Sequence, residues 1–131
     1  MPALIQFDLV SPERTLLSAE AEMVTIPGSE GYMGVMAGHM PLISTLRAGM
    51  IDVLKDGKDT RYFIRGGFVE IAGDKVTVLA DEAVPFSELA LETLDQRIRD
   101  AEEELAAAKD ERARRRAAES LDGLRLVRAA F

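Results

Sequence analysis

Apolar and polar side chains alternate one by one through much of the first two thirds of the chain. The stretch LIQFDLV, residues 4–10, shows this pattern, and β-branched and aromatic residues recur through residues 61–80. A period of two residues predicts strands with one buried face. Several short strands at close spacing indicate an antiparallel sandwich or barrel. No segment before Ser87 is long enough for the crossover helices of a parallel sheet.

Dipeptides that contain glycine lie between and within these runs. Asp56-Gly57 separates two apolar runs and is a strong signal for a two-residue hairpin turn. Gly66-Gly67 and Gly73-Asp74 carry further turn signals within the next long run. The pattern therefore predicts strands that follow one another closely and reverse at these dipeptides.

A different composition begins at Ser87. All five prolines and nine of the ten glycines precede it, whereas ten of the 45 residues from Ser87 to Phe131 are alanine. Because proline and glycine mark turns and alanine favours helix, we divide the chain into a β domain, residues 1–86, and a helical part, residues 87–131. We expect Ser87 to cap the first helix, with Glu88 and Glu92 in its first turns, where the helix dipole favours acids.

The helical part carries an apolar seam with steps of three and four residues, made of Leu91, Leu94, Ile98, Ala101, Leu105 and Ala108. The seam breaks at residues 109–112 and resumes at Ala117, Leu121 and Leu124. On pattern alone, one long helix with a skip and two antiparallel helices are both open. Charge mildly favours the hairpin, because residues 87–108 carry a net charge of −5 and residues 109–131 carry +3.

Length and composition narrow the possibilities further. A chain of 131 residues with 47% hydrophobic residues suits one core, or one domain with an appendage. The net charge of −7 works against binding to nucleic acid or anionic lipid. The absence of cysteine excludes disulfides and thiolate metal sites. We expect no signal peptide and no membrane span, so a partner would hold the protein at any membrane.

The glycine-rich stretch, residues 27–45, does not fit a phosphate-binding loop. None of its four glycines is followed by lysine, and the dinucleotide-binding spacing is absent too. His39 is the only histidine, so neither a zinc site nor a nucleophile–base pair is supported. We expect turns and close strand contacts here, with His39 in a structural or interface role. Met33, Met36 and Met40 flank the glycines and suit either core packing or a contact surface.

Charged clusters give no active site either. The acids at residues 102–104 and 81–82 are typical of a solvated face rather than a general acid–base pair. Arg112–Arg116 is the one basic cluster, and it suits pairing with the acidic helix or an acidic protein surface. From residue chemistry alone, the chain is a β domain with a helical appendage that binds other proteins.

Two long blocks carry a resemblance to a known family. IPGSEGYMGVMAGHMPLISTLRAGMIDV, residues 26–53, and GGFVEIAGDKVTVLADEA, residues 66–83, closely resemble the ε subunit of bacterial F-type ATP synthases. LVSPER near the start and LRLVRA near the end also fit. The resemblance implies a β-sandwich of about ten strands followed by a two-helix antiparallel hairpin.

The resemblance also implies a role. It describes a non-catalytic subunit of the central stalk that holds the γ subunit and sits on the proton-translocating ring. Its place is the cytoplasmic face of the bacterial inner membrane, with no nucleic acid partner and no insertion into the lipid. The candidate contacts with γ and the ring are Ser11, Glu30, Tyr32, His39 and Ser44. Tyr32 replaces an acidic residue of some members, so the ring contact is expected to be more apolar here.

In several members the hairpin inhibits ATP hydrolysis through basic residues that meet acidic residues of the catalytic β subunits. The candidates in this chain are Arg112, Arg114, Arg115, Arg116, Arg125 and Arg128. Some members bind ATP at the hairpin, and Asp95 and Arg99 are the candidates for that site. The residue that should be arginine is Ile98, and a shift of one position turns a side chain by about 100° around a helix. This departure argues against ATP binding, and we expect no cofactor. A nucleotide-sensing module whose hairpin binds ATP is the alternative function.

Overall fold

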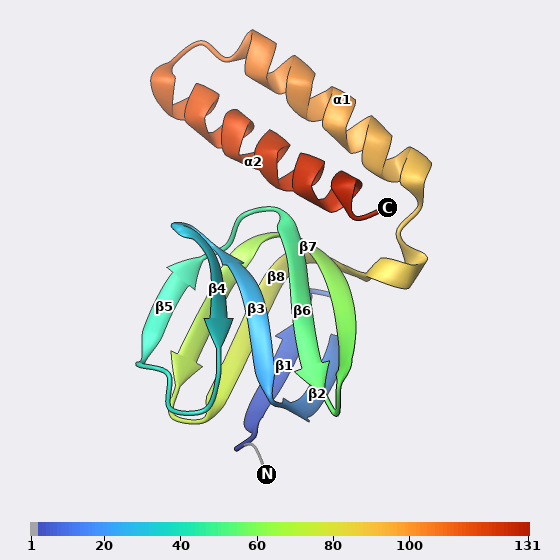
Figure 1. Cartoon of the computed structure of the whole chain (residues 1–131). Helices are drawn as coiled ribbons and strands as arrows, with labels where there is room; N and C mark the ends of the chain where they lie inside the picture. The colour runs from blue at the N-terminus through green and yellow to red at the C-terminus, as the bar shows by residue number, and fades with distance from the viewer. Residues whose placement is uncertain (1–2) are drawn as a thin grey trace.

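The computed structural model describes residues 3–131 as eight strands followed by two helices (Figure 1). The strands are β1 (Ile5–Val10), β2 (Thr15–Ala21), β3 (Met23–Gly28), β4 (Gly31–Val35), β5 (Leu42–Thr45), β6 (Gly49–Lys55), β7 (Lys58–Ala72) and β8 (Lys75–Pro85). A 3₁₀ turn, Phe86–Glu88, leads to α1 (Leu91–Ala107) and α2 (Glu111–Ala129). The expected strand-rich first part and helical hairpin are confirmed.

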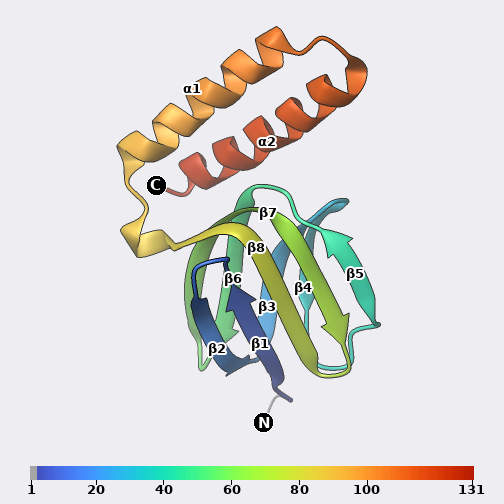
Figure 2. The same cartoon turned by 180° about the vertical axis from the view of Figure 1, so that it is seen from behind.

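The strands form a sandwich whose two layers share β7 and β8. The strand order is β2-β1-β8-β7-β6-β3-β4, and β5 pairs with β7 as well. The first part of β7 pairs with β6, from Lys58 to Ile64, and its last part pairs with β5, from Phe68 to Ile71. Each end of β7 therefore belongs to a different layer, and Figures 1 and 2 show β3, β4 and β6 on one side and β1, β2 and β5 on the other.

Gly66 and Gly67 make this change of layer possible. They have φ angles of +68° and +103°, which favour glycine, yet pairing with β8 continues on both sides of them, from Arg65↔Glu82 to Gly67↔Ala80. The dipeptide is therefore a kink within β7 and not the turn expected from sequence. Because β7 and β8 each run through both layers, residues 3–131 form eight strands and not about ten.

The turns at two other dipeptides are confirmed. Asp56 and Gly57 have φ angles of +52° and +76° and join β6 to β7, with Lys55 paired to Lys58. Gly73-Asp74 joins β7 to β8. Long-range pairing adds one feature that the alternation does not reveal, because β1 lies parallel to β8 while the remaining pairs are antiparallel.

The first helix starts later than expected. Ser87 lies exposed in the 3₁₀ turn, and α1 begins at Leu91 after Ala90, without a side-chain cap. Leu89 and Ala90 are extended between the two, and the Leu89 side chain is buried. Burial of Leu89 therefore takes precedence over the capping preference of Ser87, so the prediction of Ser87 as N-cap is wrong.

The break in the apolar seam is the turn between the helices. α1 ends at Ala107, and α2 begins at Glu111 after Asp110, whose carboxylate accepts a hydrogen bond from the Ala113 amide at 2.8 Å. The two helices pack antiparallel, and opposite charges meet across them, as expected from their net charges. Leu91 is the exception in the seam, since its side chain is exposed.

Two apolar cores result. The larger fills the sandwich and includes Phe7, Ile26, Ile51 and Val69. The smaller core joins the hairpin to one end of the sandwich, where Ala48 and Phe63 pack with residues of both helices, namely Leu94, Ala101, Leu121, Leu124 and Val127. The hairpin is therefore docked on the sandwich (Figure 1).

Candidate functional site

One segment of the sandwich carries no charged side chain. Residues 31–46 comprise β4, the β4–β5 loop, β5 and Leu46, and contain no Asp, Glu, Lys or Arg in a chain that is 30% charged. We call this segment the uncharged edge. The lack of charge is a property of the sequence, and the fold brings these residues to the sandwich edge.

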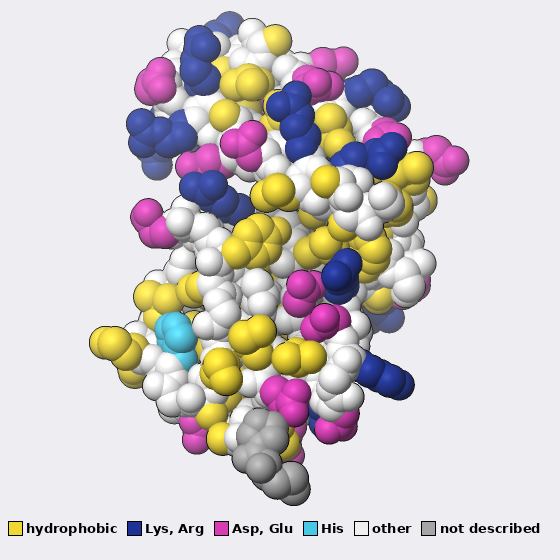
Figure 3. Space-filling model, viewed as in Figure 1, with side chains coloured by type: hydrophobic (Ala, Val, Ile, Leu, Met, Phe, Trp, Pro, Cys, Tyr) yellow, Lys and Arg dark blue, Asp and Glu magenta, His cyan; other side chains and the backbone are white. Residues whose placement is uncertain are grey.

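The uncharged edge exposes large apolar side chains. Met40 is 77% exposed, Ile43 69% and Met36 57%. Met36 and Met40 flank His39 in the sequence, and Figure 3 shows hydrophobic side chains gathered around the single histidine. The paired residues Phe68 and Leu79 of β7 and β8 are exposed too, and Phe68 also pairs with Thr45 of β5. Contiguous exposed apolar surface marks a place where another protein binds.

The backbone of the uncharged edge is also open to a partner. Among the described residues, β4 pairs with β3 alone and β5 with β7 alone, so both are edge strands, one in each layer. Edge strands in proteins that remain monomeric are commonly protected by charged side chains. Here that protection is missing, which suits an edge that is covered in an assembly.

Three of the candidate contact residues lie together at the hairpin end of the uncharged edge. Glu30, in the β3–β4 turn, Tyr32 and Ser44 line one surface hollow. The Tyr32 hydroxyl accepts a hydrogen bond from the Met50 amide at 3.1 Å. The Ser44 hydroxyl donates to the Thr45 carbonyl at 2.9 Å and accepts from the Ser29 amide at 3.4 Å. Glu30 and Tyr32 keep their side chains exposed.

The structure separates the other two candidates from this group. His39 lies in the β4–β5 loop, at the other end of β4, and its Nδ1 is 2.7 Å from the Met40 carbonyl oxygen. Ser11 is buried, and its hydroxyl donates to the Arg14 carbonyl at 3.2 Å within the β1–β2 turn. A partner at the β1–β2 turn would meet the exposed neighbours of Ser11 more readily than its hydroxyl.

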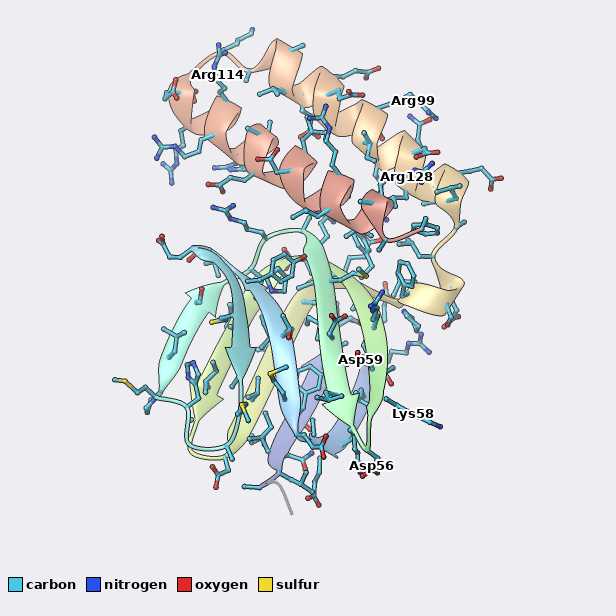
Figure 4. All side chains as sticks on the ribbon, viewed as in Figure 1. Asp56, Lys58, Asp59, Arg99, Arg114 and Arg128 are labelled. Carbon is cyan, nitrogen blue, oxygen red and sulfur yellow. The ribbon has the colours of Figure 1, made fainter. Side chains whose placement is uncertain are left out.

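The six candidate arginines of α2 fall into two groups. Arg125 donates to Glu102 at 3.3 Å, and Arg128 donates to Asp95 at 2.9 Å, so both pair with α1. The other four are Arg112, Arg114, Arg115 and Arg116, which lie exposed near the start of α2. None of them forms an ion pair with a described side chain. Figure 4 shows Arg114 at the tip of the hairpin, far from Arg128. We call these four the basic tip.

The two candidate nucleotide-binding residues are engaged within the hairpin. Asp95 accepts the hydrogen bond from Arg128, and Arg99 donates to the Gln96 side chain at 2.7 Å. In the docked hairpin, Asp95 and Arg99 therefore each have a hydrogen-bond partner within the chain. Throughout residues 3–131, the carboxylates and the single histidine form no group of three or more that could hold a metal ion.

Glu82 links the hairpin to the sandwich. Its carboxylate, at the hairpin end of β8, accepts hydrogen bonds from Arg97 of α1 and from Arg65 of β7, the latter at 3.1 Å. Burial works to raise the pKa of Glu82, but the two arginines outweigh it and hold the pKa below its ordinary value. Arg97 also stacks over the Phe63 ring at 5.6 Å, so charge and apolar packing meet at this junction.

No helix in the described part of the chain is long and apolar enough to span a bilayer.

Known proteins are similar in sequence to this chain along nearly its whole length. Residues 4–86 match the family model of the ATP synthase delta/epsilon chain, β-sandwich domain. The ATP synthase epsilon chain of Parvibaculum lavamentivorans is 48% identical over 129 residues, covering 98% of both chains. The epsilon chain of Mesorhizobium japonicum is 40% identical and covers 100% of this chain and 98% of its own.

Solved structures agree with the sequence relatives. A chain in the Euglena gracilis mitochondrial ATP synthase, solved as OSCP/F1/c-ring, has a TM-score of 0.78 and 30% identity, covering 99% of this chain and 82% of that one. A chain in the central stalk/c-ring of the Tetrahymena thermophila enzyme has a TM-score of 0.66 at 13% identity, which shows a shared fold. With a docked helical hairpin behind a matching β-sandwich, this chain belongs to the epsilon-chain family of ATP synthases.

Proposed function

We propose that this epsilon chain is a non-catalytic clamp at the foot of the central stalk, where it holds the γ subunit and sits on the proton-translocating ring. Its place is then the cytoplasmic face of a bacterial inner membrane, where it stays peripheral. The observation that carries the proposal is the uncharged edge, because it combines unprotected edge strands with exposed apolar side chains. Torque passes through such a clamp by contact alone, so no catalytic group is required.

The geometry of the edge favours two contacts over one. The β3–β4 turn with Glu30 and Tyr32 lies at the hairpin end of β4, and the β4–β5 loop with His39 lies at the other end. A subunit wedged between a stalk and a ring needs surfaces that face in different directions. Met36 and Met40, in the same loop as His39, and Ile43 of β5 supply adaptable apolar contact.

A single charge placed on the uncharged edge tests this proposal. Ile43→Asp puts a carboxylate where a partner would remove it from water, whereas the isolated chain should change in stability by only about 0.5 kcal/mol because Ile43 is 69% exposed. Thr60→Asp, an equally charged substitution on an exposed strand position outside the edge, is the matched control. We expect Ile43→Asp to lower co-purification with γ and the ring and to lower proton-driven ATP synthesis. Normal assembly and synthesis with Ile43→Asp would contradict the proposal.

The basic tip supports a second role, restraint of ATP hydrolysis. Four arginines without a partner inside the described chain are available to acidic residues of the catalytic β subunits. Arg125 and Arg128 would have to leave Glu102 and Asp95 before they could contribute. We therefore assign any inhibitory contact made by the docked hairpin to the basic tip.

We further propose that the hairpin works without a nucleotide. Asp95 and Arg99 are each engaged by a neighbour, and Ile98 replaces the expected arginine. Equilibrium dialysis of the full chain against ATP tests this proposal directly. Saturable binding at millimolar ATP would favour the nucleotide-sensing alternative.

A further inference from the structure

Gly123 is the only glycine in either helix, and its position is unusual. It is buried in α2, where glycine weakens a helix relative to alanine. A Cβ at this position would overlap the carbonyl oxygen of Ala48 and lie 2.9 Å from the Ala48 carbonyl carbon. The backbone of α2 therefore rests directly on the backbone of the β5–β6 turn, and only glycine permits this distance.

The β5–β6 turn, taken together with the first two residues of β6 as residues 46–50, is held to α2 by more than this contact. Arg47 donates to Glu119 of α2 at 3.3 Å. Ala48 and Met50 pack into the smaller core beside Leu121 and Leu124. One face of the turn is thus covered by the docked hairpin.

The other face of the same turn contacts residues 27–32, which comprise the β3–β4 turn and the adjoining strand ends and are called the β3–β4 loop below. The Arg47 amide donates to the Pro27 carbonyl at 3.0 Å, and the Met50 amide donates to the Tyr32 hydroxyl at 3.1 Å. Leu46 forms an isolated bridge with Gly28. The turn therefore lies between α2 and the loop that carries Glu30 and Tyr32.

The loop and the helix also meet directly. Pro27, Gly31 and Tyr32 line an apolar cavity together with three residues of α2, Asp122, Gly123 and Leu126. A shift of α2 would open this cavity and remove support from the Tyr32 ring. Contacts thus run without a gap from α2 to the loop, both through the turn and across the cavity.

We propose that the docked hairpin is a positioning element for the β3–β4 loop, and that the contact of Gly123 with Ala48 sets its position. In the docked state the turn presents its Arg47 and Met50 amides to Pro27 and Tyr32, and the loop is ordered for its partner in the rotor. Displacement of α2 from Ala48 removes this order from the turn and the loop, and the affinity for the partner falls. The identity of the partner rests on the proposed function, but the coupling inside the chain does not.

Amide hydrogen exchange of the full chain, read by NMR at single residues, tests the coupling. Gly123→Leu forces α2 away from Ala48, and Ala106→Leu adds a leucine at an exposed position of α1 as the matched control. We expect the Arg47 and Met50 amides to exchange at least tenfold faster in Gly123→Leu and at the original rate in Ala106→Leu. Amides of β1 and β8 should keep their protection in both variants.

Unchanged exchange at Arg47 and Met50 in Gly123→Leu would overturn the inference. If that variant lost protection throughout the sandwich, Gly123→Ala would decide, because it adds one methyl group and strengthens the helix itself. The same tenfold loss at Arg47 and Met50 in Gly123→Ala supports the coupling, and its absence refutes it.

Binding to a purified complex of γ and the ring is the second readout. We expect Gly123→Leu to bind at least tenfold more weakly than the original chain and than Ala106→Leu. Equal affinity despite faster exchange would refute a positioning role for the hairpin. If the original chain itself failed to bind, the proposed function would be wrong, while the exchange result would still decide the coupling.

Discussion

Replacing Gly67 by alanine tests the kink that lets β7 serve both layers. Gly67 has a φ of +103°, outside the range that side chains with a Cβ readily adopt. An added Cβ would overlap the Leu79 carbonyl oxygen and lie 2.8 Å from the Ala80 Cα. Both neighbours are backbone atoms of β8, so relief requires β7 and β8 to separate locally.

The expected loss of stability follows from these two effects. An unfavourable backbone conformation costs about 1–3 kcal/mol. Separation of β7 from β8 weakens one or two backbone hydrogen bonds, and the bond from the Leu46 amide to the Gly67 carbonyl is at risk as well, at about 1 kcal/mol each. The free energy of unfolding should therefore fall by about 3–6 kcal/mol.

Gly73→Ala is the matched control for this substitution. Gly73 has a φ of +60°, but no other group lies within 4 Å of a Cβ there, so only the backbone term applies, about 1–2 kcal/mol. Urea unfolding followed by far-UV circular dichroism gives both values from the shift in midpoint. A loss for Gly67→Ala no larger than that for Gly73→Ala would refute the reasoning.

Three further predictions concern the hairpin. The pKa of Glu82 in the folded protein lies below its ordinary value of 4.5. The ionised carboxylate therefore stabilises the fold fully at pH values above 4.5, and this stabilisation is lost as the pH falls through the folded-state pKa. Glu82→Gln should therefore be less stable at pH 7 and should lose less stability between pH 5 and 3, as measured by thermal unfolding. Leu94→Ala, at a fully buried position between hairpin and sandwich, should cost about 2–5 kcal/mol of hairpin stability, measured by hydrogen exchange in α1. A chain ending at Phe86 should raise ATP hydrolysis by the reconstituted enzyme several-fold. Alanine at all four residues of the basic tip should reproduce most of that rise, whereas the control Arg99→Ala should not. Unchanged hydrolysis in an assembled enzyme would mean that the hairpin has only a structural role.

The sequence predicted some residues of the candidate site. The resemblance singled out Glu30, Tyr32 and Ser44, and the structure brings these three together. It did not reveal that Ser11 is buried, since an isolated serine after a strand looks the same whether its hydroxyl faces solvent or closes a turn. The sequence shows that residues 31–46 carry no charge, but only the fold shows that these residues form edge strands.

Local signals determined the elements of this protein by themselves. Alternation of side chains, the αL preference of Asp56-Gly57 and the break in the helical seam each depend on residues within a few positions of one another. These features act through backbone dihedral angles and helix periodicity, which neighbouring residues set. That is why the hairpin turns at residues 56–57 and 73–74 and the division between α1 and α2 are confirmed.

Tertiary structure alone decided what the remaining glycines do. Positive φ angles at Gly66-Gly67 suit a reversal or a kink equally well, and the kink results because β5 and β6 pair with different parts of the same strand. Gly123 weakens its own helix, and glycine is needed there because the backbone of Ala48, far away in sequence, lies against it. Such positions are settled by close approach between distant segments, and no local preference encodes that approach because it exists only after the chain has folded.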